Sequence, residues 1–102
     1  MKIAHIAKSK NGLTIRLTAE RWCHITEEHC ELAGMREEIL ETIQEPELIL
    51  SGSYDELLAV KPIEDKKYLV VVYRETNDDG FVITAFFTKR YRSLTKRRQV
   101  WP

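Results

Sequence analysis

Apolar and polar residues alternate one by one near the start of the chain. From Leu13 to Thr18 every second residue is apolar, the pattern of a strand with one buried and one wet face. A second strand-like segment covers residues 2–7, and the connection between them contains Asn11-Gly12, a dipeptide typical of tight hairpin turns. The chain is therefore expected to begin with an antiparallel hairpin.

The pattern then becomes helical. Thr18 is a suitable N-cap and predicts a helix from residue 19 to about residue 24 or beyond. Thr26 is followed by two glutamates and could cap a second helix, so we expect either one short helix or two helices with a break near residues 25–26. A clearer helix ends at Pro46. Its apolar stripe at three- and four-residue spacing consists of Leu32, Met35, Ile39 and Ile43.

The second half of the chain has the composition of strands. Residues 47–51 and 57–63 are short candidates. Residues 67–75 and 81–88 are near-continuous runs of β-branched and aromatic residues, joined by a turn at Asp78-Asp79-Gly80. Because both runs are apolar throughout, we expect them to form a hairpin at the centre of the sheet.

The predicted fold class is α+β. An N-terminal hairpin and helices would be followed by an antiparallel sheet of about four strands. A chain of 102 residues with 43% hydrophobic residues fits one domain, residues 1–102, with a basic C-terminal tail from about residue 89.

Symmetric pairing of the last hairpin about its loop would define two faces. The face expected to be the better core carries Tyr68, Val70, Val72, Ile83, Ala85 and Phe87. The other face mixes hydroxyl groups with aromatic rings, which suits a partly open cleft; it carries Val71, Tyr73, Val82, Thr84, Phe86 and Thr88.

Charge is strongly segregated although the net charge is zero, with 16 basic and 16 acidic residues. Residues 20–47 contain nine acidic and two basic residues, whereas residues 89–102 contain six basic residues and no acidic one. This pattern indicates a basic patch for an anion, two halves that attract each other, or two solvated faces. No export signal or membrane span is recognisable, so we expect a cytoplasmic protein in which Cys23 and Cys30 are free thiols.

The segment from residue 21 to residue 30 contains the strongest candidates for chemistry. His24 and His29 lie close to Arg21, and together they could supply a base, an acid and a phosphate-binding cation. Alternatively, a continuous helix would place His29 on its apolar face as a half-buried core residue. A zinc site is not expected, because on such a helix Cys23 and Cys30 would lie roughly 10 Å apart and the histidines would point about 140° apart.

The sequence lacks the motifs of several other classes of enzyme. The sequence has no Gly-rich phosphate loop, no Ser-centred elbow and no acidic cluster on the strands for magnesium. The functions that remain are acid–base catalysis without a metal, or binding without catalysis, and we expect no cofactor. Thr84 and Thr88 alternate with Phe86 and could bind phosphate and stack a base, or simply form an ordinary strand face.

Five short stretches together resemble a known family. Residues 18–25, 28–32, 43–47, 68–72 and 81–86 are similar to the phage-associated nucleases of the barnase–EndoU–colicin–RelE (BECR) group. The resemblance extends roughly from Leu13 to Trp101 and implies helices first, a four-stranded antiparallel sheet after them, and a toxin-like ribonuclease activity. Carried over residue by residue, it places four residues in the active-site neighbourhood: His24, His29, Glu31 and Thr84. The family often has His-Pro-Glu where this chain has His29-Cys30-Glu31.

These considerations lead to one hypothesis and two alternatives. The hypothesis is a metal-independent endoribonuclease, in which the 2′-OH of RNA attacks the adjacent phosphate. His24 and His29 would be base and acid, in either order. Arg21, with Arg74 or Lys89, would bind the phosphate, and Thr84 and Thr88 would orient it. A base of the RNA would stack on Phe86, Tyr73 or Tyr91.

An antitoxin or immunity protein would be a possible partner of such an enzyme, besides RNA itself. The first alternative is a non-catalytic RNA- or protein-binding module that uses the sheet face and the basic tail. The second is a scaffold that dimerises through the basic tail of one chain and the acidic helix of another. The sequence does not predict the oligomeric state.

Overall fold

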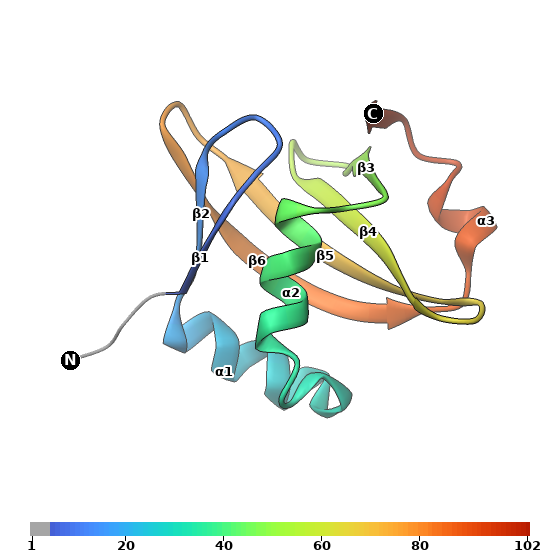
Figure 1. The fold of residues 1–102 in the computed structure, drawn as a ribbon, viewed down its shortest axis with the longest axis horizontal. Coiled ribbons are helices and arrows are strands. Elements are labelled where there is room, and N and C mark those ends of the chain that lie inside the picture. The colour runs from blue at the N-terminus through green and yellow to red at the C-terminus, as the bar shows by residue number, and fades with distance from the viewer. Residues whose placement is uncertain (1–4) are drawn as a thin grey trace.

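The computed structural model describes residues 5–102 and contains one seven-stranded sheet with helices packed on it (Figure 1). The strand order is β1-β2-β6-β5-β4-β3-β7. In chain order the elements are β1 (His5–Lys8), β2 (Thr14–Leu17), α1 (Ala19–Glu28), the short 3₁₀ helix η1 (Cys30–Leu32), α2 (Arg36–Gln44), β3 (Leu48–Ser51), β4 (Leu57–Glu64), β5 (Lys67–Glu75), β6 (Asp79–Thr88), α3 (Tyr91–Leu94) and β7 (Gln99–Trp101).

The α+β class is confirmed, but the expected sheet of about four antiparallel strands is wrong. The N-terminal hairpin joins the sheet through a parallel pairing of β2 with β6, in which Arg16 lies opposite Phe81. At the other end, the three-residue strand β7 pairs with β3. The β5–β6 hairpin lies inside the sheet, as predicted from its apolar strands.

The first hairpin forms as its turn dipeptide predicts. Strands β1 and β2 pair antiparallel, and Gly12 has a φ of 81°, which a residue with a side chain rarely adopts. The amide of Ser9 closes the loop on the carbonyl of Leu13 at 2.9 Å. Residues 2–4 of the predicted first strand lie outside the described residues.

The predicted break in the first helix is absent, because α1 runs unbroken from Ala19 to Glu28. Thr18 caps it as expected, its hydroxyl accepting from the amide of Arg21 at 3.1 Å. Thr26 does not cap a second helix. Its hydroxyl donates instead to the carbonyls of Trp22 and Cys23 within α1, so it is not available to accept from the backbone amides of a following helix.

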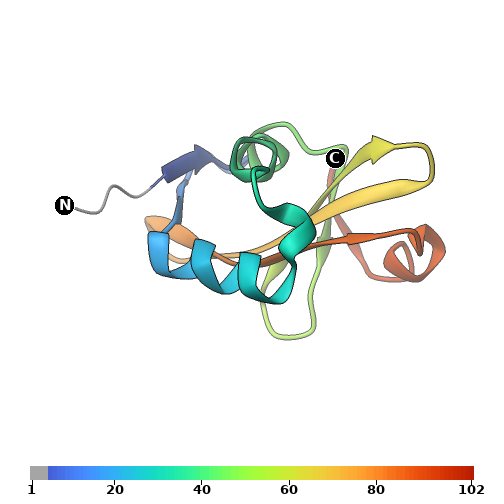
Figure 2. The same cartoon turned by 90° about the horizontal axis from the view of Figure 1, so that it is seen from below.

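The main core lies between α2 and the concave face of the curled sheet, which we call the inner face (Figure 2). The predicted apolar stripe is confirmed: Ile39 and Ile43 of α2 are fully buried together with Leu32, and Met35 packs against the same core. The strands contribute Ile15, Leu17, Ala59, Leu69, Val71, Tyr73, Val82 and Ala85.

A second, smaller core covers the opposite side, which we call the outer face. There Leu94 of α3 is buried against β3, β4 and β5, and Tyr91 packs beside it. The strands supply Leu48, Leu50, Leu58, Val60, Val70 and Val72. Helices α2 and α3 therefore lie on opposite faces of the sheet (Figure 2).

The register of the β5–β6 hairpin differs from the symmetric pairing expected. Val70 lies opposite Phe86 and Val72 opposite Thr84, with a bulge after Val72. The turn is closed by the amide of Thr76, which donates to the carbonyl of Asp79, and next to it Tyr73 lies opposite Val82 as expected. The bulge adds one residue to β6 between Val82 and Thr84, and it shifts the rest of the pairing. As a result, the outer face combines Tyr68, Val70 and Val72 with Thr84, Phe86 and Thr88, and the better core lies under Leu69, Val71 and Tyr73.

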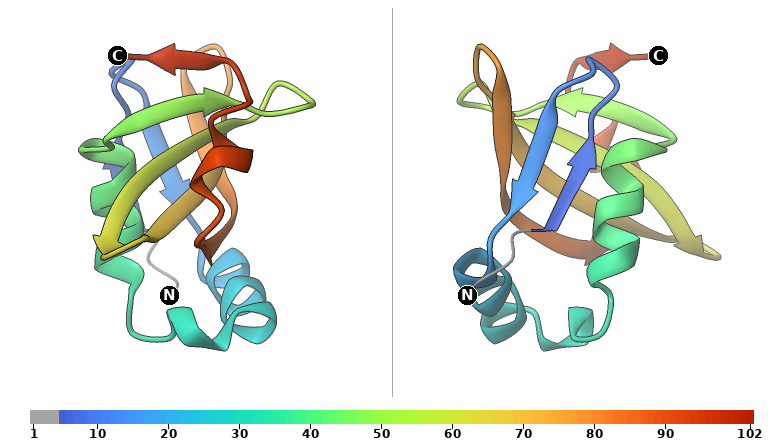
Figure 3. Two further views of the ribbon diagram at one scale, coloured as in Figure 1. Left: turned by 90° about the vertical axis from the view of Figure 1, so that its right-hand side faces the viewer. Right: turned by 60° about the vertical axis from the view of Figure 1, so that its left-hand side comes forward.

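The curled sheet brings its two ends close to each other. Figure 3 shows the β1–β2 loop near β7, and the ammonium of Lys10 lies 5.0 Å from the centre of the Trp101 ring. A cavity of about 210 Å³ lies there, lined in part by Asn11, Glu75 and Val100. No helix in the described part of the chain is long and apolar enough to cross a membrane.

Candidate functional site

Strand β6 has an edge that no other strand covers along its second half. Strand β2 pairs only with the segment from Asp79 to Phe81. Helix α1 also packs against β6 (Figure 3). The anchor is Ile25, which is 1% exposed and belongs to the main core. The candidate site is the junction of α1 and β6.

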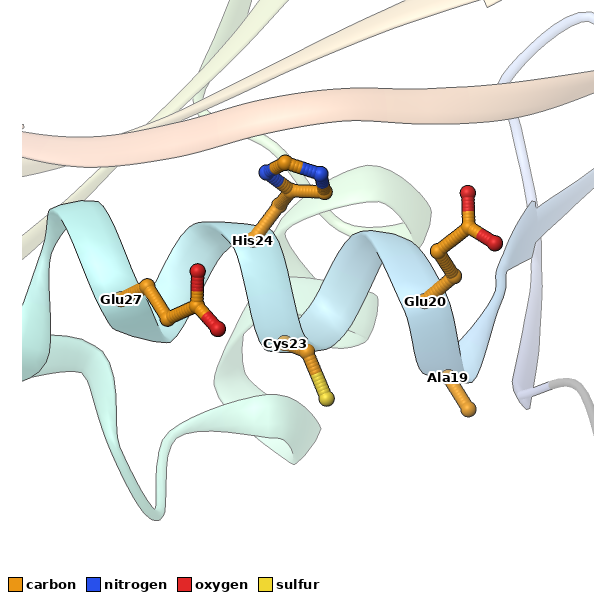
Figure 4. A pocket seen from close by; sticks show the side chains of 5 residues that line it. All are labelled: Ala19, Glu20, Cys23, His24 and Glu27. Atoms are coloured by element: carbon orange, nitrogen blue, oxygen red, sulfur yellow. The ribbon is translucent and has the colours of Figure 1, made fainter.

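His24 projects from α1 on the side that faces β6, as does Glu20, whereas Cys23 points the other way (Figure 4). The imidazole is exposed, so His24 is not a core residue. Together with Ala19 and Glu27 these residues line an open hollow of about 380 Å³. A histidine in this position can exchange protons with a bound molecule.

His29 follows the last turn of α1 and lies against the outer face of β6. Its amide bonds the carbonyl of Ile25 at 2.7 Å, which fixes the position of the backbone. The ring centre is 6.4 Å from that of Phe86, and the side chain is 33% exposed. The Nδ1 atom lies 3.8 Å from a carboxylate oxygen of Glu31. His29 is therefore half-buried but open to solvent.

The hydroxyl-bearing residues of β6 share a face with Phe86. Thr84 and Thr88 lie on the outer face, two residues to either side of Phe86, and all three are half-buried. The hydroxyl of Thr88 accepts from the amide of Arg90 at 3.0 Å and so shapes the turn into α3. Thr84 forms no side-chain hydrogen bond within residues 5–102, which leaves its hydroxyl able to bind a ligand.

The observed pairing of β5 with β6 changes which aromatic residues lie on the same face as Phe86. Tyr73 is 1% exposed on the inner face, so its assignment as a stacking residue is wrong. Burial raises the pKa of its phenol well above the usual range, and the charge of Glu75 adds to this effect. Tyr68, which the sequence analysis did not select, lies on the outer face instead and stacks on Tyr91 with ring centres 4.6 Å apart.

The proposed phosphate-binding cations do not all meet at the histidines. Arg21 is exposed on α1 and forms no ion pair within the described residues. Lys89 is exposed directly after β6. Arg74 lies near the other end of β5, opposite Phe81, and its Nη2 donates to the carbonyl of Tyr54 at 2.6 Å. Arg74 is thus not brought to the same place as the histidines.

The basic tail and the acidic helix α2 are separated by the sheet. The six basic residues of the tail are all exposed, before, on or after α3, and none forms an ion pair with a carboxylate within residues 5–102. Glutamates of α2 and its C-cap pair instead with Lys61 and Lys10. The two charged segments therefore do not neutralise each other within one chain. The basic residues are Lys89, Arg90, Arg92, Lys96, Arg97 and Arg98.

A metal centre finds no support in the arrangement of side chains. Among the described residues, no three histidine, cysteine, aspartate or glutamate side chains gather closely enough to hold an ion. Cys23 and Cys30 are both exposed and free.

No family model, no curated protein and no solved structure matches the chain. The inference of function therefore depends on the residues of the site.

Proposed function

We propose that this protein is a metal-independent endoribonuclease whose cleavage site lies between α1 and β6. The observation that carries the proposal is that both candidate histidines lie along the same strand. His24 is on the side of α1 that faces β6 (Figure 4). The ring of His29 lies beside that of Phe86. Two histidines next to one substrate can serve as general base and general acid near neutral pH.

The reaction would begin with attack of a ribose 2′-OH on the adjacent phosphorus. One histidine takes the hydroxyl proton, and the other gives a proton to the 5′-oxygen as the P–O5′ bond breaks. The products are a 2′,3′-cyclic phosphate and a free 5′-OH. Arg21 and Lys89 are the exposed cations nearest in sequence to the site and would attract the phosphate, while Thr84 would orient it by a hydrogen bond.

The chain's resemblance to the BECR nucleases supports the same assignment. It selects His24, His29, Glu31 and Thr84, and the carboxylate of Glu31 lies 3.8 Å from the ring of His29. A toxin-like ribonuclease of this group would have an antitoxin or immunity protein as its partner.

A second candidate function is RNA binding without cleavage. It is favoured by the stacked rings of Tyr68 and Tyr91 on the outer face, next to the exposed cations of the tail. Aromatic rings interleaved with basic residues are a common arrangement in proteins that bind single-stranded RNA.

Cleavage of a single-stranded RNA oligonucleotide in the presence of EDTA tests the proposal. His24→Ala and His29→Ala should each lower the rate by about 10²–10⁴, the usual contribution of a general acid or base. Both side chains are at least partly exposed, so the melting temperature should change little. The third histidine, His5 on β1, provides the matched control, and His5→Ala should leave the rate unchanged.

The outcomes separate the two functions. Binding of the oligonucleotide without any cleavage product would leave RNA binding as the function. If cleavage persists at the full rate in both histidine variants while they remain folded, the catalytic assignment is wrong.

A further inference from the structure

The loop between β3 and β4 holds a carboxylate against its own backbone. The side chain of Glu56 folds back, and its Oε1 accepts from the amide of Tyr54 at 2.5 Å. It lies so close to Gly52 that a Cβ added there would be 2.4 Å from Glu56 side-chain atoms. The loop is tight, with Asp55 at a φ of 68°. The carboxylate of Glu56 is therefore held by the backbone of its own loop.

Two arginines from distant parts of the chain reach the same loop. The Nη2 of Arg74, on β5, donates to the carbonyl of Tyr54 at 2.6 Å. The Nη1 of Arg97, after α3, donates to the hydroxyl of Ser53 at 3.3 Å. The Nε of Arg74 is buried and has no hydrogen-bond partner in the described part of the chain. One backbone amide thus donates to the carboxylate, and two arginines donate to neighbouring atoms of the same loop.

The electrostatics agree with this geometry. The backbone amide of Tyr54 lowers the pKa of the Glu56 carboxyl below its ordinary value, and the charges of Arg74 and Arg97 lower it further. The charged form of the side chain is the one that the loop stabilises. Guanidinium groups and backbone N–H groups in a tight turn are also the donors that bind phosphate.

We propose that this loop is a phosphate-binding site and that the carboxylate of Glu56 occupies it when no ligand is bound. The inference deepens the proposed function and rests on it in one respect, because the phosphate would belong to the RNA strand. Arg74 lies four residues along β5 from Val70, the partner of Phe86, which is roughly 13 Å for an extended strand. An RNA strand held at the histidines can extend to this loop.

The internal carboxylate has a measurable consequence, since a phosphate must displace it or share the arginines with it. Glu56→Gln keeps the size of the side chain and an oxygen acceptor but removes the charge. Affinity for inorganic phosphate should then rise about tenfold, the effect of one nearby like charge at a protein surface. Gly52→Ala keeps the charge but forces the flexible Glu56 side chain out of the loop, and it should raise the affinity in the same direction.

Titration of inorganic phosphate into the full chain, followed by amide NMR shifts, tests the site. Shifts should concentrate on residues 53–56, and the gain of Glu56→Gln should disappear when Arg97→Ala is added. Glu47→Gln removes the same charge just before β3, four or five residues from the loop, and should change the affinity less than twofold. An equal gain in Glu47→Gln, or no gain in Glu56→Gln, would overturn the proposal.

A 2′-O-methyl oligonucleotide distinguishes the source of the phosphate, because it cannot be cleaved by 2′-OH attack. If Glu56→Gln tightens its binding as well, the loop belongs to the RNA site. If only inorganic phosphate gains, the role in RNA binding is wrong although the phosphate site stands. Because neither measurement uses cleavage, a protein that fails to cut RNA can still confirm the loop site.

Discussion

Replacing Ile39 by alanine measures how strongly α2 is held by the inner face of the sheet. Ile39 is fully buried in the main core. The change removes three carbon groups, and at ~0.8 kcal/mol for each buried group the transfer contribution alone is ~2.4 kcal/mol. The cavity left behind adds to this, so we expect a loss of ~2.5–4 kcal/mol in the free energy of unfolding.

Urea denaturation followed by circular dichroism is the assay, with the slope m unchanged and the midpoint lowered. At about 4–8 °C per kcal/mol for a domain of this size, the melting temperature should fall by at least ~10 °C. Ile6 offers a control of the same residue type, because it is 58% exposed on β1, and Ile6→Ala should stay within about 0.5 kcal/mol of the wild type. A loss below ~0.5 kcal/mol for Ile39→Ala would show that the packing of α2 was misjudged.

Three further predictions concern the tyrosine core, the outer face and the tail. Because the raised pKa of Tyr73 keeps it protonated in the folded protein while the unfolded chain ionises above pH 10.0, stability should fall by up to ~1.4 kcal/mol per pH unit above that value. In urea titrations at pH 9–11 this loss should be smaller in Tyr73→Phe; equal losses would contradict it. Phe86→Ala should weaken binding of single-stranded RNA by ~1–3 kcal/mol in fluorescence anisotropy, and equal weakening by Phe81→Ala, on the far part of β6, would argue against a stacking role. Replacing Arg90 and Arg92 by glutamine should flatten the salt dependence of RNA binding, and an unchanged slope would exclude these residues as phosphate contacts.

The elements with strong local signals could be predicted from the sequence. Gly12 and its asparagine neighbour predicted the first turn, the stripe through Ile39 predicted α2, and the apolar run of β5 predicted a central strand. Each of these elements is determined by residues close together in the sequence: the first by the turn conformation, the second by the helical period, and the third by a run of apolar residues buried on both faces.

Features that depend on distant parts of the chain could not be predicted. The bulge between Val82 and Thr84 determines whether Phe86 shares a face with Tyr68 or with Tyr73, and no local pattern in the sequence predicts it. Strand β7 has only three residues, and it forms by pairing with β3, which lies about 50 residues earlier in the chain. At the candidate site, the sequence selected His24 and His29, but their position along β6 depends on the edge of that strand that β2 leaves uncovered beyond Phe81.

The loop that holds Glu56 was missed for a related reason. Gly52 marks a turn in the sequence, but the arginines that complete the loop come from β5 and from the segment after α3. Arg74 was selected as a phosphate-binding residue, whereas its location far from the histidines follows only from the strand order.

The parallel pairing of β2 with β6 has a consequence for the order in which the molecule assembles. The β1–β2 hairpin is local in sequence and can form early, but its place in the sheet depends on β6, whose paired residues lie about 65 positions later in the chain. Until β6 is in place, the edge of β2 offers unpaired backbone groups to any other strand. The interval between hairpin formation and docking is therefore the stage at which this protein is most exposed to aggregation, and slow refolding at high protein concentration should lower the yield more than refolding in dilute solution.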